Sequence, residues 1–382
     1  MRYFSFFVVI FFLTSCSQKN NPVAVDIQEE NIFSLKPDKL DTLMYSDLYC
    51  DVEFVPLECD ASLPFGEISD LKITQSADFI VFDIIQKGIF RFDSTGHFLN
   101  NIGQCGHANQ EYIEPLGIAY DKYNNKVLVN DNAKQRIVRY NLDGTFCDEI
   151  KLDFYFNAFG VIDSTHIALF LDYYWQNNRK EDYNFKVVDL SGKVIYEAFP
   201  YSFVKNQIHH DCKHVFEDSD YGLLFLQPGT SVLYKVTSNS LVPMYFVNYS
   251  DEDLIKQDTA VRCPVFNQKI SESKYQIHSI FLVNGKFLSN VVDERKFYFW
   301  VQDIKNKDIH FFSTFGFLHN DLKGSITNYF IKTTSGGNIY YVIEPDDIPL
   351  IVQNEEMSCK NKEFVDLLSK HTNPIIQICT LK

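Results

Sequence analysis

The chain has 382 residues, a mass of 44.5 kDa and a formal net charge of −15 at pH 7. The excess of acidic residues argues against nucleic acid as a partner, because nucleic-acid-binding domains carry basic surfaces. With 46% hydrophobic and 15% aromatic residues, the chain can bury a large core and is neither disordered nor a small disulfide scaffold. Thirty-five Phe and 22 Tyr against four Met indicate an all-β fold.

The N-terminus predicts an export signal followed by a lipid anchor. Residues 4–13 are largely apolar, but this run is too short to cross a hydrocarbon core of about 30 Å as a mature helix. It ends in Leu13-Thr14-Ser15-Cys16, which resembles a bacterial lipobox, and acyl chains on Cys16 would hold the protein on a membrane. We therefore expect a signal peptide over residues 1–15 and a lipidated polar tether over residues 16–47.

The residue after Cys16 bears on the destination. An ordinary secretory signal with an incidental cysteine is the alternative, but Leu13 and the small Ser15 fit the lipobox better. Ser17 stands where an Asp would favour retention at the inner membrane, so similarity to lipoprotein sorting signals predicts the outer membrane. The membrane, reached through the lipid anchor, is the first expected partner, and the sequence leaves open which leaflet carries the protein.

A repeat of about 48 residues predicts the architecture. The segment 89–98 recurs at 137–146 and more loosely at 185–194, and Gly96 and Gly144 are 48 residues apart. In each unit, alternating apolar runs flank a four-residue turn that ends in Gly, which tolerates positive φ. A unit of this length with four short strands is typical of a propeller blade, whose sheet is buried by its neighbours around an axis.

The remaining chain provides the other blades. From residue 52 onward it accommodates six units of about 55 residues, so we predict an all-β, six-bladed β-propeller of four-stranded antiparallel blades over residues 48–382. Residues 52–58 alternate like a strand, and we expect them to pair near residues 374–380. This pairing of N- and C-terminal strands would close the ring and remove its free sheet edges.

Several segments resemble the six-bladed β-propeller lipoproteins of Bacteroidetes, whose blades are similar to NHL repeats. The chain departs from this family at residues 107–110, where a Pro-Gly pair is usual. The resemblance implies the fold and an envelope location and assigns no catalytic residues. We expect Gly103, Gly106, Glu111 and Tyr112 to form a crossover between blades. The segments that carry the resemblance are Phe54-Val55-Pro56-Leu57-Glu58, Gly103-Gln104-Cys105-Gly106 before Glu111-Tyr112, the turns at Gly96 and Gly144, and Asn373-Pro374-Ile375.

The sequence contains no familiar catalytic motif. GxSxG, GxGxxG, Walker, HExxH and EF-hand patterns are missing, and no CxxC pair predicts a zinc or iron–sulfur site. The densest group of metal-capable side chains, at residues 209–214, falls between two blades and is better explained as a polar connector. We therefore expect no metal and no cofactor.

An aromatic run interrupts the third repeat and is the candidate ligand-binding site. Tyr173, Tyr174 and Trp175 are followed by amides and by Arg179. Flat rings beside polar groups suit stacking on a sugar or gripping a peptide. The simpler interpretation is a hairpin whose rings cover the next blade, and burial of all three rings would exclude binding.

Two functional classes remain open. The first is a non-enzymatic propeller at the outer membrane that binds a glycan, peptide or protein and assists uptake. The second is a propeller hydrolase or lyase that acts on an extracellular polymer. The sequence favours binding, since no catalytic constellation is visible, although propeller enzymes assemble their sites from loops of several blades. A cluster at the channel mouth that joins His or Tyr to carboxylate and Arg would favour the enzyme.

Overall fold

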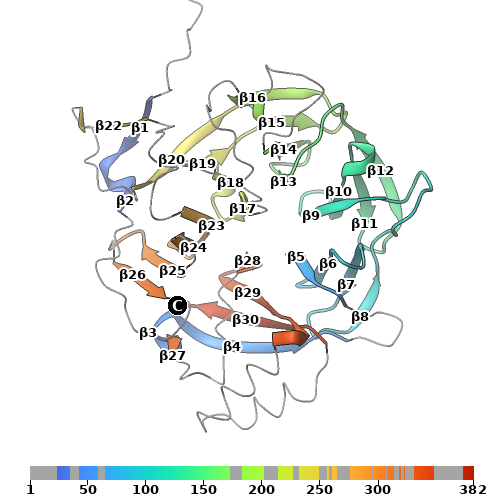
Figure 1. Ribbon diagram of the computed structural model, residues 1–382, viewed down its shortest axis with the longest axis horizontal. Helices are drawn as coiled ribbons and strands as arrows, with labels where there is room; N and C mark the ends of the chain where they lie inside the picture. Colours follow the sequence, from blue (N-terminus) through green and yellow to red (C-terminus); the bar gives the residue numbers. More distant parts are fainter. Residues whose placement is uncertain are drawn as a thin grey trace, which may run out of the picture.

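The computed structural model describes most of the chain, in several stretches. It comprises residues 24–34, 43–58, 65–172, 183–201, 214–226, 232–248, 256–257, 260–264, 276–293, 296–306, 308–313, 318–319, 322, 331–347 and 373–382. Within these stretches the main architecture is six four-stranded antiparallel sheets arranged around a central axis, with almost no helix (Figure 1). The predicted six-bladed β-propeller is therefore confirmed.

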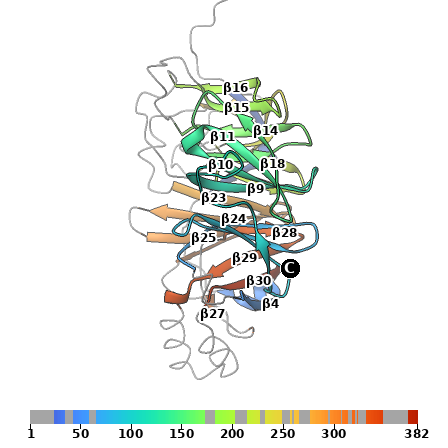
Figure 2. The ribbon, with the colours of Figure 1, turned by 90° about the vertical axis from the view of Figure 1, so that its right-hand side faces the viewer.

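Each blade begins with its innermost strand and runs outward, as Figures 1 and 2 show. Blade 1 consists of β5 (Ile68–Ile73), β6 (Phe79–Asp83), β7 (Gly88–Phe92) and β8 (Phe98–Asn101). Blade 2 consists of β9 (Pro115–Asp121), β10 (Lys126–Asp131), β11 (Arg136–Asn141) and β12 (Phe146–Lys151). Blade 3 consists of β13 (Ala158–Val161), β14 (His166–Phe170), β15 (Tyr183–Asp189) and β16 (Val194–Pro200). Blades 4 and 5 consist of β17 (Phe216–Ser219), β18 (Gly222–Leu226), β19 (Val232–Val236) and β20 (Leu241–Asn248); and β23 (Gln276–Val283), β24 (Lys286–Asp293), β25 (Lys296–Asp303) and β26 (Ile309–Ser313).

The two ends of the chain share blade 6. Its inner strands are β28 (Thr333–Ser335), β29 (Asn338–Ile343) and β30 (Ile375–Leu381), and its outermost strand is the N-terminal β4 (Tyr49–Pro56). The antiparallel register of β4 with β30 runs from Tyr49 opposite Leu381 to Pro56 opposite Ile375. The predicted closure by the terminal strands is confirmed, and the pairing begins a few residues earlier than the sequence indicated.

The hydrophobic core lies between the blades. Buried side chains of the described residues fall into six clusters, one at each interface between neighbouring blades. On β10, Val127 and Val129 pack with blade 1, whereas Leu128 between them packs with Leu169 of blade 3. Successive side chains of a strand point to opposite faces, so a strand that neighbouring blades cover on both faces, as β10 is, carries apolar residues at successive positions. Each such fully buried side chain contributes about 1.5–3 kcal/mol relative to exposure.

The 48-residue repeat has a physical cause in these interfaces. The turns between third and fourth strands contain Gly96, Gly144 and Gly192 at φ values of 90°, 84° and 83°. A Cβ at these positions would lie 2.0–2.2 Å from a backbone oxygen of the preceding blade's outermost strand. Each turn therefore packs against the neighbouring blade so closely that only glycine fits.

The N-terminal segment is partly folded against blade 4. β1 (Ala24–Gln28) pairs with β22 (Ala260–Pro264), which also pairs with β21 (Lys256–Gln257), and the 3-10 turn η1 (Glu29–Asn31) leads into β2 (Ile32–Ser34). β2 pairs in parallel with β20 as a fifth strand. Part of the segment expected to be a free tether, residues 24–34, is thus attached to the propeller, because its apolar side chains complete the core at blade 4.

Short elements complete the described structure. β3 (Leu43–Met44) pairs in parallel with β27 (Leu318–His319), and α1 (Tyr45–Leu48) leads into β4. The 3-10 turns η2 (Asn132–Lys134) and η5 (Pro345–Asp347) follow second strands of blades 2 and 6. No helix among the described residues is both long and apolar enough to span a bilayer.

Candidate functional site

The innermost strands β5, β9, β13, β17, β23 and β28 surround the central channel (Figure 1). Each is followed by a turn to the second strand of its blade, and these turns share one face of the ring, because the first strands all run in the same direction along the axis. We call this face the turn face. It brings together polar side chains that are far apart in the sequence.

An ion pair crosses the channel mouth on the turn face. Lys122, directly after β9, places its Nζ 2.8 Å from Oδ1 of Asp218 on β17. The two residues are 96 positions apart, which is two repeats, so the pair joins blade 2 to blade 4 past blade 3. Burial lowers the pKa of Lys122, but the hydrogen bond and charge of Asp218 outweigh it and raise the pKa overall. A pair this exposed contributes only about 0.2–1 kcal/mol to stability, so it is available to exchange partners.

One exposed tyrosine ring lies beside this ion pair, and a second exposed tyrosine belongs to the turn that follows Asp218. Tyr123 is 49% and Tyr221 is 42% exposed. Lys122 Nζ lies 5.6 Å from the centroid of the Tyr123 ring. The buried Asp121 fixes the turn that carries Tyr123, since its Oδ1 accepts a 3.0 Å hydrogen bond from the Tyr123 amide. The Tyr123 ring is thus presented on a fixed turn beside a charged pair.

Neighbouring turns support the same mouth. Gln75 of the β5–β6 turn donates from Nε2 to the Lys122 carbonyl oxygen at 3.1 Å. The Tyr120 hydroxyl donates to Asn125 Oδ1 at 2.8 Å. The Gln75 bond connects the turns of blades 1 and 2, and the Tyr120 bond closes the β9–β10 turn that carries Lys122.

Blade 3 contributes a histidine to the turn face, but its arrangement does not support catalysis. His166 Nδ1 lies 3.0 Å from the Thr165 hydroxyl oxygen and 3.0 Å from Asp163 Oδ1. Both oxygens meet the same ring nitrogen, whereas a histidine that relays a proton uses its two nitrogens for its two partners. The three residues are local to one turn, and their contacts stabilise that turn.

A buried carboxyl group lies in the channel. Glu217 of β17 is 8% exposed, and its Oε1 accepts a hydrogen bond from the Thr334 hydroxyl of β28, which links blades 4 and 6. Burial raises the pKa of Glu217 to about 8, although Thr334 and the charge of Lys72 act in the opposite direction. Lys72 itself pairs with Asp70 at 2.8 Å. Glu217 is therefore predominantly protonated at neutral pH.

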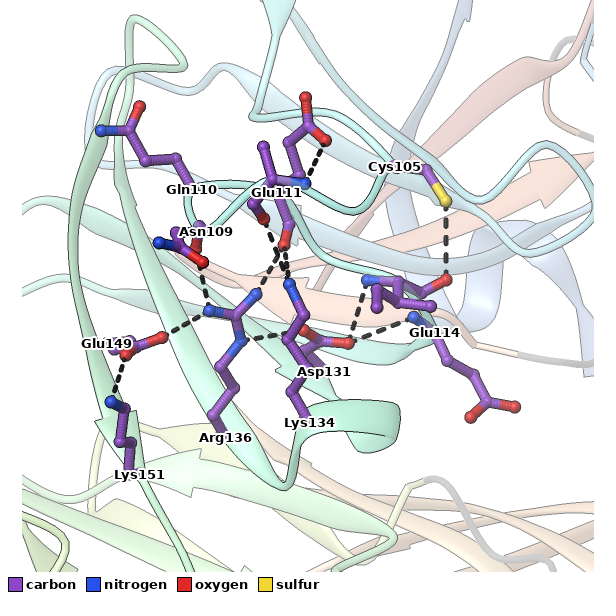
Figure 3. Close-up of polar contacts among 12 residues, drawn as sticks. Cys105, Asn109, Gln110, Glu111, Glu114, Asp131, Lys134, Arg136, Glu149 and Lys151 are labelled. Atoms are coloured by element: carbon purple, nitrogen blue, oxygen red, sulfur yellow. Dashed lines mark hydrogen bonds and ion pairs between the residues drawn. The ribbon is translucent and has the colours of Figure 1, made fainter.

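The crossover between blades 1 and 2 holds a second polar cluster, shown in Figure 3. Arg136 is 4% exposed and donates to Asp131 Oδ2 and to the Asn109 carbonyl oxygen, each at 2.9 Å. Asp131 Oδ1 accepts from the amides of Ile113 and Glu114 at 3.0 and 3.1 Å. These groups are occupied in holding the loop after Gly103 to blade 2.

The expected crossover role of this loop agrees with its contacts. The Glu111 carboxylate accepts from the Ala108 amide at 2.9 Å, and a Cβ on Gly106 would lie 2.1 Å from Glu111 Oε2. Tyr112 is buried against Tyr140, with ring centroids 6.1 Å apart. A cavity of about 250 Å³ adjoins the loop, lined in part by Phe90, Gln104, Cys105 and Tyr112.

The residues singled out from the sequence lie outside the described part of the chain. Tyr173, Tyr174, Trp175 and Arg179 follow the end of blade 3's second strand, and the lipobox Cys16 precedes β1. Both assignments stay predictions. Sequence reasoning missed the mouth residues because no local motif marks them; the usable signal is their place at the ends of first strands, spaced by multiples of the repeat. Those residues are Lys122, Tyr123, Asp218 and Tyr221.

Comparison with known proteins gives a family and a fold. A sequence model of the family described as a domain of unknown function, DUF4934, matches residues 26–380. No curated protein matches the chain. A solved protein of Bacteroides fragilis, suggested to be exported, superposes with a TM-score of 0.70 at 16% identity, over 92% of this chain and 99% of its own. A DUF4221 member of Bacteroides vulgatus has a TM-score of 0.49 at 12% identity, over 91% and 99% of the two chains.

Proposed function

Because this chain belongs to the DUF4934 family, whose function is unknown, its role has to be argued from its site, and we propose that it is a lipid-anchored binding propeller of the outer membrane. It binds a glycan or a peptide at the channel mouth on the turn face and does not transform it. The observation that carries this proposal is the ion pair of Lys122 and Asp218 beside the exposed ring of Tyr123, with the exposed Tyr221 on the next turn of blade 4.

The chemistry of the mouth suits these two ligand classes. Exposed tyrosine rings offer a flat apolar face for a sugar ring or a peptide side chain, and each hydroxyl offers a hydrogen bond. A partly exposed ammonium and carboxylate can each turn to ligand hydroxyls or amides at small cost, because their own pairing is weak. The local Thr165–His166 arrangement offers no proton relay, so binding is better supported than hydrolysis or elimination.

The anchoring part of the proposal is supported by the sequence around Cys16, which resembles a lipobox. The similar Bacteroides fragilis structure comes from a protein that is suggested to be exported, which is compatible with an envelope location. Replacement Cys16→Ala should abolish labelling by a fatty-acid probe and release the protein from the membrane fraction. Cys50→Ala is the matched control, since Cys50 is also a free thiol and is exposed. Continued labelling of Cys16→Ala would refute anchoring at this residue.

The binding part is tested with glycan and peptide arrays probed with the mature protein, followed by affinity measurement for each hit. Tyr123→Ala and Tyr221→Ala should each weaken binding by about 1 kcal/mol or more, roughly fivefold, with little change in unfolding. Leu99→Ala is the control, because Leu99 is 44% exposed on β8, away from the channel. If neither tyrosine replacement changes the ligand affinity, the binding site lies elsewhere. If the ligand is chemically changed after incubation with the protein, the protein is an enzyme.

A further inference from the structure

We propose that the outer edge of blade 4, covered by β1 and β2, is the part of the propeller that faces the lipid bilayer. The proposal rests on the lipid anchor at Cys16 proposed above and adds an orientation to it. It follows from where the N-terminal segment attaches to the ring and from how little chain separates that attachment from the anchor.

The attachment to blade 4 is a packed one. β2 adds a fifth strand to the blade, with Phe33 opposite Val247 in a parallel register. The Phe33 side chain is wholly buried, with its ring centroid 4.8 Å from Phe287 and 5.5 Å from Tyr245. Ile27 of β1 is 2% exposed in the core between blades 3 and 4. The chain is therefore fixed to this edge from β1 onward.

The remaining tether is short. Seven residues, 17–23, lie between Cys16 and the first residue of β1, Ala24. A fully extended chain of this length reaches about 25–30 Å, and a flexible one averages about 15 Å. An acylated Cys16 sits at the membrane surface, so Ala24 and the edge of blade 4 must stay near the headgroups.

Among the described residues, no further strand is added to the opposite edge of the ring, at blade 1. The outermost strand of blade 1, β8, lies across the ring from β20 of blade 4 (Figure 1). β2 attaches to the rim of the ring, outside β20, so an anchor joined to it draws the rim, and neither face of the channel, towards the bilayer. An edge-on orientation follows, which leaves the turn face and the opposite face of the channel open to solvent.

The experiment compares two matched positions in the lipidated full-length protein on vesicles. Val242 on β20 and Leu99 on β8 are each 44% exposed, and each belongs to the fourth strand of its blade. An azide-bearing amino acid in place of either residue receives a donor fluorophore, which leaves the native cysteines untouched. Vesicles of zwitterionic and anionic lipid carry an acceptor on the headgroup, and energy transfer reports proximity to the bilayer.

We expect transfer from position 242 to exceed that from position 99 by about twofold or more, because the tether cannot exceed about 30 Å. A flexible insert of about 30 Gly and Ser residues within 17–23 should reduce the difference, since it raises the maximum length of the tether from about 30 Å to about 130 Å and roughly doubles its average length. Equal transfer at both positions, or stronger transfer at 99, would overturn the orientation. Fatty-acid labelling is measured on the same samples, so a protein without lipid would overturn the anchor itself and is distinguished from a lipidated protein in another orientation.

Discussion

Gly144 of the β11–β12 turn lies against the Asn101 carbonyl oxygen of β8, so closely that a Cβ on Gly144 would be 2.0 Å from that oxygen. The Gly103 amide also donates to the Gly144 carbonyl oxygen at 3.2 Å. One turn thus joins blade 2 to the edge of blade 1 and to the start of the crossover. The same arrangement recurs at Gly96 and Gly192, where the nearest oxygens belong to Pro56 and Lys151.

This contact predicts that Gly144→Ala lowers the free energy of unfolding by about 3 kcal/mol or more. Two effects add: an alanine at φ 84° is strained, and its methyl group forces the two blades apart. Gly222→Ala tests the backbone strain alone, because Gly222 has a φ of 98° but the nearest atom to a new Cβ would be 3.6 Å away. Urea unfolding should show a much smaller loss for Gly222→Ala; equal losses would mean that the contact between blades adds nothing.

The buried carboxyl group predicts a pH dependence of stability. Burial raises the pKa of Glu217 in the folded protein to about 8, from its ordinary value of 4.5, so the folded protein holds a proton that the unfolded chain releases. The buried Glu217 carboxyl group lowers the free energy of unfolding by an amount that is absent below about pH 4.5, grows as the pH rises towards 8 and then levels off. Glu217→Gln keeps an oxygen that can accept from Thr334 and removes the ionisation.

We therefore expect Glu217→Gln to unfold at higher urea concentration than the native protein at pH 8–9, by about 1 kcal/mol or more, and the difference to shrink towards pH 5. Because all other titrating groups are common to both proteins, the difference isolates this one. Glu114→Gln is the control, since it makes the same replacement at an exposed residue of the crossover between blades 1 and 2. A difference between Glu217→Gln and native protein that does not change with pH would contradict the burial of an ionisable group here.

Removal of residues 375–382 deletes β30 and leaves β29 and β4 without their shared partner. Two sheet edges with unpaired backbone groups then face solvent, and such edges pair with other chains. We expect the truncated protein to aggregate rather than to be mildly destabilised, as followed by light scattering and size-exclusion chromatography. A monomeric truncated protein with a cooperative unfolding transition would show that the ring does not need its terminal strands.

The aromatic run at 173–175 gives a prediction that distinguishes ligand binding from packing against a blade. β14 runs antiparallel to β13, so the chain leaves β14 at Phe170 on the side opposite the turn face. If ligand binds there, Tyr173→Ala and Trp175→Ala should weaken binding by about 1 kcal/mol or more with little change in unfolding. If the rings pack against a blade, Trp175→Ala should instead cost about 3 kcal/mol or more of stability.

The blade pattern could be predicted because its signals lie within short stretches of each repeat. The glycine turns repeat at a fixed spacing, and strands such as Lys126–Asp131 are apolar at successive positions because both faces are covered. The attachment of residues 24–34 could not be predicted in this way, since its partners lie on β20 and β22, more than two hundred residues away. The ion pair of Lys122 and Asp218 was missed for the same reason: charged residues near turns usually face solvent, and only the closed ring brings these two together.

The pairing of β4 with β30 also has a consequence for the order in which the protein can fold. β4 lies near the start of the chain, at residues 49–56, whereas its partner strand consists of residues 375–381. Blade 6 is therefore completed only by the last part of the chain to be synthesised. Contacts between such distant segments are slow to form, because a long loop must close first. Until then the growing chain has an unpaired β4 and an open ring, and such species aggregate readily. A chain that emerges from the ribosome from its N-terminus therefore cannot acquire its closed form until residues 375–381 have been released.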